Sequence, residues 1–363
     1  MSWSWKLGRV AGIDVYVHAT FLILLGWVAL AEYLPTRSVA AAADGLLFIL
    51  TVFGVVVLHE LGHATMARRF GVRTRDITLL PIGGVARLER MPDYPPHELL
   101  VALAGPAVNV ALAAILYVVL AVPGVSPFDR VSMMGGSFLV RLFWVNVSLA
   151  LFNLLPAFPM DGGRVFRAAL AFRMDRVRAT EIAARTGQAM ALLFGIAGLF
   201  FNPFLLFIAL FVWMGAAREA AATQLREALD GIPVGRVMVT ELHTLSPQDR
   251  IGRAVDAVLA GFQRDFPVVD GDGRLVGVLT QADLLRALAE RGPETPASEV
   301  MRKDYVTAEE SELLSTALAR LEACNCHALP VTNRGKLSGI LTMDNLGEYL
   351  LVQNALRRRP ATA

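Results

Sequence analysis

The chain has 363 residues, a formal net charge of +2 and a hydrophobic fraction of 55%. So small a charge points to no class of charged partner, and we expect no nucleic-acid partner. Apolar residues are concentrated before residue 220, in windows as long as the roughly 20 residues that a helix needs to cross a bilayer. The composition therefore excludes a wholly soluble protein and predicts a membrane domain followed by a soluble domain.

Windows of apolar residues predict the membrane spans. They cover residues 16–34, 45–67, 99–122, 137–159, 186–201 and 203–217. The last two form a predicted helical hairpin, because one helix over 186–217 would measure about 48 Å and Asn202-Pro203 interrupts it. The predicted fold class of this part is a polytopic α-helical membrane domain of about six spans.

Arginine-rich loops predict the orientation of the spans across the membrane. The loops after the second and fourth spans carry Arg68, Arg69, Arg73, Arg75, Arg87, Arg90, Arg164, Arg167, Arg173, Arg176, Arg178 and Arg185. The opposite loops carry only Arg37 and Arg130. Because cytosolic loops are richer in Lys and Arg, we expect a multi-pass protein of the cell membrane with both termini and the soluble domain in the cytosol.

The second span ends in a metal-binding pattern, His59-Glu60-x-x-His63. On a helix, the two imidazoles lie on one face with Glu60 beside them. A catalytic zinc takes such imidazoles and one more protein ligand, and leaves a position for a water molecule whose proton a glutamate can accept. Ionisable side chains inside a membrane cost on the order of 3 kcal/mol each by insertion scales and mark functional sites. We therefore predict a metal site near the cytosolic end of this span.

Asp161 is the candidate for the missing ligand, because the fourth span ends on the same cytosolic side as the second. Two prolines break the helix before it and two glycines loosen the chain after it, so its carboxylate can turn inward. On these residues alone, a cap or turn aspartate explains the pattern equally well.

A set of motifs in the membrane spans resembles the site-2 protease family. The motifs are His59-Glu60-x-x-His63, Ala104-Gly105-Pro106-x-x-Asn109 in the third span, and Asn153 through Asp161-Gly162 in the fourth. Members of that family are intramembrane zinc metalloproteases that cut transmembrane helices of substrate proteins, and the resemblance covers roughly residues 1–220. It implies zinc ligands His59, His63 and Asp161, a general base Glu60, and polar site surroundings Asn153 and Asn109.

Two further segments are predicted to lie close to this site. His18, at the cytosolic start of the first span, either snorkels at the interface or faces the site, and we favour a position near the site without ligation. Residues 72–92 predict a membrane-associated β-hairpin that turns at Pro81-Ile82-Gly83-Gly84. The family resemblance implies that this hairpin dips toward the site and pairs with an extended substrate. A hairpin on the cytosolic membrane surface is the alternative.

The soluble part contains an internal repeat with a period of about 62 residues. Gly277-Val278-Leu279-Thr280-Gln281-Ala282-Asp283-Leu284 in the unit 232–291 matches Gly339-Ile340-Leu341-Thr342-Met343-Asp344-Asn345-Leu346 in the unit 296–352. This repeat resembles a tandem pair of cystathionine-β-synthase (CBS) domains, a soluble α+β module that often binds adenine nucleotides such as ATP, ADP or AMP.

The CBS resemblance implies nucleotide contacts at Thr280, Asp283 and Thr342. Asn345 stands where the first repeat has Asp283. Because an amide accepts hydrogen bonds less strongly than a carboxylate, we expect at most one good nucleotide site. A dimerisation module without a ligand is the alternative, and the pair is a candidate contact for a homodimer, although the sequence leaves the oligomeric state open.

Cys324 and Cys326, next to His327, form an incomplete set of metal ligands. We expect two reduced thiols that act as small core residues in the cytosol, and no disulfide framework.

The predicted domain order is a membrane protease domain over 1–217, a helix-prone linker over 218–231, the CBS pair over 232–352 and a tail over 353–363. The predicted function is an intramembrane zinc endopeptidase acting in regulated intramembrane proteolysis, with an adenine nucleotide as candidate regulator. The alternatives are a CBS-regulated membrane transporter or channel and an iron enzyme with two histidines and one carboxylate. Polar residues gathered at one depth favour a catalytic pocket over a transport path.

Overall fold

The computed structural model describes residues 3–81, 83–89, 91–92, 94–128, 137–261, 263–324 and 326–357. The chain divides into two compact units, Met1–Thr223 and Gln224–Ala363. Of the predicted tail, residues 358–363 lie outside the described residues.

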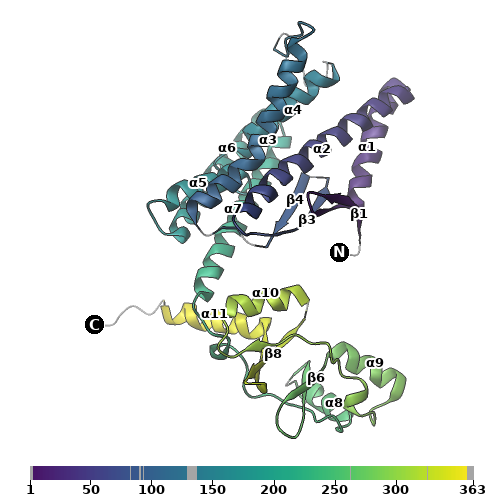
Figure 1. The fold of residues 1–363 in the computed structure, drawn as a ribbon, viewed down its shortest axis with the longest axis vertical. Coiled ribbons are helices and arrows are strands. Elements are labelled where there is room, and N and C mark those ends of the chain that lie inside the picture. Colours follow the sequence, from purple (N-terminus) through teal and green to yellow (C-terminus); the bar gives the residue numbers. More distant parts are fainter. Residues whose placement is uncertain are drawn as a thin grey trace. The chain divides into compact units, whose positions relative to one another are not determined.

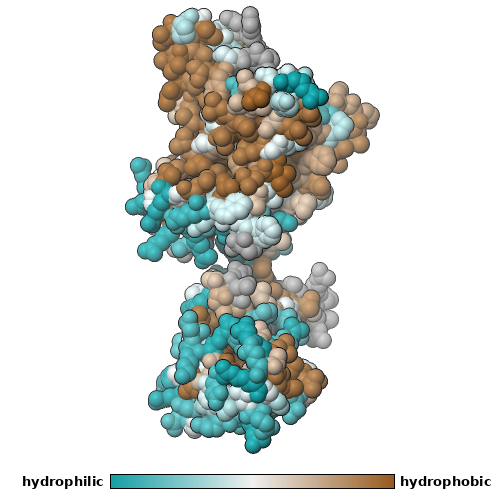
Figure 2. Space-filling model, turned by 90° about the vertical axis from the view of Figure 1, so that its right-hand side faces the viewer, coloured by the Kyte–Doolittle hydropathy of each residue, from teal (hydrophilic) through white to brown (hydrophobic). Residues whose placement is uncertain are grey.

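Helices build most of the first unit (Figure 1). They are α1 (Ala19–Thr36), α2 (Val39–Arg69), α3 (Pro95–Ala121), α4 (Phe138–Asn153), α5 (Asp161–Ala171), α6 (Arg176–Phe200) and α7 (Phe204–Leu229). Across the described ranges, the helices long and apolar enough to cross a membrane are α1, α2, α3, α6 and α7, and α4 is a shorter apolar helix of 16 residues. Figure 2 shows apolar side chains over most of the visible face of this unit, with hydrophilic side chains gathered at one end. The predicted polytopic α-helical fold is confirmed.

Helix boundaries differ from the predicted spans where capping groups act. The first helix begins at Ala19, because residues 16–18 complete a strand and His18 caps the helix. The fifth span belongs to α6, which begins at Arg176, where the Asp175 carboxylate accepts a hydrogen bond from the Arg178 N–H. Helix α7 continues through most of the predicted linker to Leu229.

A mixed β-sheet packs along α2. Its strands are β1 (Ser4–Val10), β2 (Ile13–His18), β3 (Thr74–Leu80) and β4 (Gly83–Leu88), in the order β1-β2-β3-β4. Strands β2 and β3 are parallel, and the outer pairs are antiparallel. Strands β3 and β4 form the hairpin predicted over 72–92, of which Ile82 and Arg90 lie outside the described residues. The β1–β2 hairpin was not predicted.

The sheet has one apolar face, set by alternation along its strands. Ile13 and Ile77 pack on Leu61 and Ala64 of α2 in one buried cluster. The opposite face carries ion pairs such as Lys6 to Asp14. The sheet therefore places β4 beside the end of α2 that carries the histidines.

The second unit consists of two similar halves. The first contains α8 (Gly252–Leu259), β5 (Phe266–Val269), β6 (Leu275–Leu279) and α9 (Gln281–Arg291), and the second contains β7 (Ala308–Glu309), α10 (Leu314–Cys324), β8 (Ala328–Asn333), β9 (Lys336–Thr342) and α11 (Met343–Arg357). Each half has its own apolar core.

Matching glycines show that the halves pack reciprocally. A Cβ on Gly277 would lie 2.4 Å from the Met301 sulfur, and a Cβ on Gly339 would lie 2.5 Å from the Val239 carbonyl oxygen and 2.9 Å from the Met238 sulfur. Each repeat thus needs glycine where the Val-Met segment of the other crosses it. The predicted internal repeat and its α+β class are confirmed.

The expectation for the cysteines was wrong. Cys324 and Cys326 form a disulfide with Cα atoms 5.2 Å apart. Helix α10 ends at Cys324. Reduced thiols were expected because the predicted compartment is the cytosol. The two cysteines are only two residues apart, and this short spacing allows the disulfide.

Candidate metal centre

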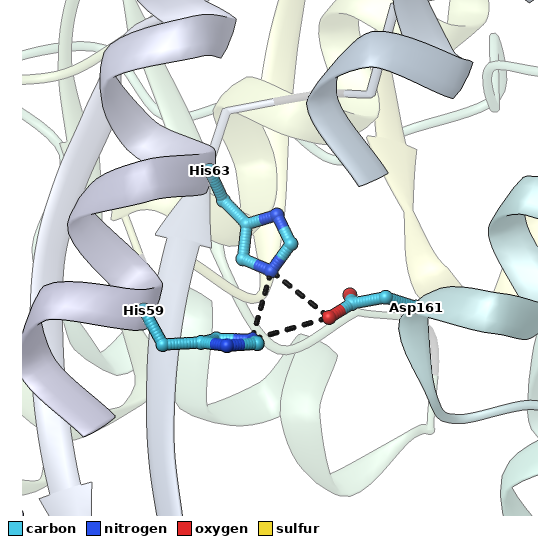
Figure 3. A group of neighbouring side chains, drawn as sticks. All are labelled: His59, His63 and Asp161. Atoms are coloured by element: carbon cyan, nitrogen blue, oxygen red, sulfur yellow. Dashed lines mark hydrogen bonds and ion pairs between the residues drawn. The ribbon is translucent and has the colours of Figure 1, made fainter. Parts of the chain in front are cut away.

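Three buried side chains converge where α2 meets the start of α5. His59 Nε2 and His63 Nε2 lie 3.1 Å apart, and Asp161 Oδ2 lies 3.2 Å from the first and 3.0 Å from the second. Figure 3 shows both imidazoles of one helix face pointing at the aspartate. Within the part of the chain that the structure describes, this is the group of His, Cys, Asp and Glu side chains that could hold a metal ion.

The spacing of these atoms fits zinc. Tetrahedral ligands at about 2.0–2.1 Å from an ion stand about 3.3 Å from one another. The three separations, 3.0 to 3.2 Å, are close to that value. Two imidazole nitrogens and one carboxylate oxygen are also a donor set that catalytic zinc sites use, with a further position left open.

The far nitrogen of each imidazole is held by a hydrogen bond. His63 Nδ1 lies 2.7 Å from the Val101 carbonyl oxygen, which can only accept, so Nδ1 carries the proton and Nε2 keeps its lone pair. His59 Nδ1 lies 2.5 Å from Oδ1 of Asn109, which is fully buried on α3. Both metal-facing nitrogens are therefore oriented before any ion binds.

Glycines bring the backbone close to the site. A Cβ on Gly105 would lie 2.2 Å from His63 Nε2 and 2.6 Å from His59 Nε2, so α3 can cross α2 here only without a side chain. A Cβ on Gly162 would lie 2.3 Å from the Leu154 carbonyl oxygen. The turn after α4 therefore packs directly on the first turn of α5 and fixes the place of Asp161.

The Glu60 side chain extends from α2 to β4, beside the cluster of His59, His63 and Asp161. Its Oε2 accepts a hydrogen bond from the Ala86 N–H of β4 over 3.3 Å. Ala86 is paired with Ile77 of β3, and a Cβ on Gly84 would lie 3.0 Å from Glu60 Cγ. The Glu60 side chain thus lies against β4, which is the last strand in the sheet order.

The other two predicted polar residues lie at element ends. Asn153 is the half-buried last residue of α4. His18 caps α1, where its Nδ1 accepts a hydrogen bond from the Thr20 N–H over 3.3 Å and lies 2.9 Å from Thr20 Oγ1. A role for either in the site stays a prediction.

Arg167 was assigned to a cytosolic loop and is instead buried on α5, with 1% of its surface exposed. Its Nε donates to Glu98 Oε1 of α3 over 2.8 Å, and its guanidinium also donates to Glu219 of α7 over 2.5 Å. The ion pairs tie the helix that starts with Asp161 to two neighbouring helices. A sequence-distant partner of this kind leaves no local pattern.

In the second unit, Thr280 and Asp283 form a cap at the start of α9. The Thr280 hydroxyl donates to the Asp283 carboxylate over 2.6 Å, and Arg302 donates to the same carboxylate. The hydrogen bonds from Arg302 hold the pKa of Asp283 below its ordinary value, and the carboxylate in turn raises the pKa of Arg302. Thr342 accepts a hydrogen bond from the Asn345 N–H over 3.3 Å, so the second repeat has the same cap without the charge.

Comparison with known proteins matches both units. The model of peptidase family M50 matches residues 47–194, and the CBS-domain model matches residues 234–290 and 297–351. The zinc metalloprotease MJ0392 of Methanocaldococcus jannaschii is 32% identical over 95% of this chain and 96% of its own length. The Rip3 protein of Mycobacterium tuberculosis, which carries the name of a zinc metalloprotease, is 30% identical over 98% of this chain and 94% of its own.

A solved structure described as the site-2 protease from Methanocaldococcus jannaschii is 34% identical, covers 67% of this chain and 99% of its own, and has a TM-score of 0.44. The names of the two relatives and the match to peptidase family M50 agree with the zinc-type donor set on α2 and α5, and the CBS-domain match agrees with the repeat of the second unit. The chain therefore belongs to the site-2 protease family, peptidase family M50, and is a multi-pass zinc metalloprotease that carries a tandem pair of CBS domains.

Proposed function

We propose that the protein is an intramembrane zinc endopeptidase that hydrolyses a peptide bond within or near a transmembrane helix of a substrate protein. The observation that carries this proposal is the convergence of His59, His63 and Asp161 at the end of the apolar helix α2, with Glu60 beside them. The three side chains are the proposed zinc ligands. Family membership as a metalloprotease leaves the transporter and iron-enzyme alternatives without support.

A zinc ion held by His59, His63 and Asp161 would supply Lewis-acid chemistry, since catalytic zinc lowers the pKa of a bound water to about 7 and polarises carbonyl groups. Glu60 is the proposed general base, which accepts the proton of the attacking water and passes it to the leaving amine. The Ala86 N–H donates to one oxygen of that carboxylate, which orients it. Asn153, Asn109 and His18 are the proposed polar surroundings.

The contact of Glu60 with β4, the last strand in the sheet order, supports a binding mode for the substrate. A helical peptide bond is shielded by its own hydrogen bonds, so the substrate must be unwound before water can attack. An unwound segment that pairs with β4 as an added strand keeps its backbone groups hydrogen-bonded in the membrane. The same segment lies next to the Glu60 carboxylate. Substrate therefore adds to the sheet at β4 in this proposal.

The arginine-rich loops support a cytosolic position for both termini and for the metal centre's end of α2. In the second unit, the Asp283 carboxylate and the Arg302 guanidinium offer paired acceptor and donor groups for the ribose and phosphate of one adenine nucleotide, next to Thr280. Binding there is the proposed regulatory input, and the CBS pair is the proposed homodimer contact. If millimolar ATP, ADP and AMP all leave the cleavage rate of the whole protein unchanged, this regulatory part is wrong.

The central experiment compares the wild-type protein with Glu60→Gln after reconstitution with candidate single-span substrates. We expect hydrolysis to stop in the variant while its zinc content stays the same, because the amide cannot accept the proton and is not a proposed ligand. Equal cleavage by both proteins would show that the mechanism is wrong.

A further inference from the structure

A line of buried hydrogen bonds runs from His59 away from the proposed zinc position. His59 Nδ1 lies 2.5 Å from Asn109 Oδ1. Asn109 Nδ2 donates to Asn146 Oδ1 over 3.2 Å, and Asn146 Nδ2 donates to the Leu142 carbonyl oxygen over 2.9 Å. Both asparagines have 0% of their surface exposed. The line crosses from α2 through α3 to α4.

The Leu142 carbonyl fixes the direction of the whole line. A backbone carbonyl only accepts hydrogen bonds, so Asn146 must present its amide nitrogen to it and its oxygen to Asn109. Asn109 then presents its nitrogen to Asn146 and its oxygen to His59. Because that oxygen is an acceptor, His59 carries its proton on Nδ1 and keeps the Nε2 lone pair that faces Asp161.

His63 also carries its proton on Nδ1, and a single hydrogen bond holds it there. Its Nδ1 donates directly to the Val101 carbonyl oxygen. His59 contacts an amide instead, and the two ends of an asparagine amide have nearly the same shape but opposite hydrogen-bonding roles. Without Asn146 to hold it, Asn109 could turn its nitrogen toward His59 and favour the tautomer with the proton on Nε2. In an apolar helix bundle, water does not readily replace the missing partner.

We propose that Asn146 is a positioning residue of the metal site, which holds the Asn109 amide so that His59 presents Nε2 to zinc. Asn146 does not contact the proposed ligand atoms and acts through Asn109. This inference rests on the proposed zinc site. It extends that site to α4, a helix that contributes none of the three proposed ligands.

The test measures the zinc affinity of the full-length protein by competition with a chelator. Asn146→Leu removes the acceptor for Asn109, and we expect zinc binding to weaken about 10- to 100-fold, as for other residues that orient metal-binding histidines. Val140→Ala is the control, because it removes buried apolar volume from the same helix without touching the line.

A wild-type affinity for Asn146→Leu in folded protein would overturn the inference, as would an equal loss of affinity in Val140→Ala. Should Asn146→Leu not fold, Asn146→Thr and Asn146→Val form a second test, since they share one shape and differ in a hydroxyl. That hydroxyl can donate to the Leu142 carbonyl one turn earlier and accept from Asn109. Tighter zinc binding by the threonine variant supports the inference, and equal affinities overturn it.

His59→Ala separates this inference from the proposed zinc site. If His59→Ala binds zinc as well as wild type, the proposed site is wrong. If His59→Ala loses zinc while Asn146→Leu does not, the site stands and the role of Asn146 is wrong.

Discussion

Gly105→Ala tests whether the close approach of α3 to the two imidazoles matters for the metal. The added Cβ would lie 2.2 Å from His63 Nε2 and 2.6 Å from His59 Nε2. Comfortable carbon contacts begin at about 3.5 Å, so an imidazole or α3 must shift by about 1.3 Å. Metal–ligand distances tolerate changes of only about 0.2 Å. We therefore expect a zinc affinity lower by about a hundredfold or more, or about 2.7 kcal/mol.

The same substitution should not unfold the protein, because alanine is a better helix former than glycine by about 1 kcal/mol. The assay is zinc content and affinity of the purified protein, with thermal unfolding measured alongside. Gly54→Ala is the matched control on α2, since a Cβ there meets nothing within 4 Å. Wild-type zinc affinity in Gly105→Ala, or an equal loss in Gly54→Ala, would refute the reasoning.

Three further substitutions test other parts of the molecule. Arg167→Met should remove the hydrogen-bonded partner of the buried Glu98 carboxylate, leaving its 3.8 Å contact with Arg176, and cost about 3–5 kcal/mol, which thermal unfolding in detergent measures; an unchanged midpoint would contradict it. Because the pKa of Asp283 is lowered in the folded state, its ion pair with Arg302 stabilises the second unit above the ordinary pKa of the carboxyl and is lost as the pH falls through the folded value. Asp283→Asn should therefore make the free energy of unfolding less dependent on pH in the acid range. An unchanged dependence on pH in that range would contradict the role of this ion pair. Ala86→Pro removes the N–H that donates to the carboxylate of Glu60, the proposed general base, so kcat/KM should fall about tenfold or more with zinc content unchanged; full activity would contradict the proposed role of β4.

The candidate metal centre was largely predictable because its elements obey local rules. The spacing of His59 and His63 places both on one helix face whatever surrounds the helix. Topology then brought Asp161 to the same end of the bundle, and the structure places it within 3.2 Å of both imidazoles. Nothing local distinguished a ligand from a cap at Asp161, and its inward direction comes from the packing of Gly162 on the preceding turn.

Residues whose roles depend on distant partners were missed. Asn146 is one polar residue in an apolar run, and its importance comes from Asn109 on another helix. Arg167 resembled the basic loop residues around it, although Glu98 and Glu219 bury it. The partner of Asp283 likewise lies in the other repeat, at Arg302.

The N-terminal hairpin was missed because hydropathy windows do not distinguish strand from helix. Residues 13–18 alternate apolar and polar side chains with a period of two, which is typical of a half-buried strand. The apolar helix that follows them dominated the window and extended the predicted span to residue 16. A separate count of both periods would have found β2, whereas its parallel pairing with β3 depends on the fold.

The position of the cleaved bond tests the central claim most directly. Wild-type protein and Glu60→Gln are reconstituted in lipid with one single-span substrate, their zinc contents are matched, and the products are mapped by mass spectrometry. We predict cleavage inside or at the edge of the apolar span of the substrate by the wild type, and none by the variant. Equal products from both proteins, or cleavage confined to segments far outside the membrane, would contradict an intramembrane zinc endopeptidase.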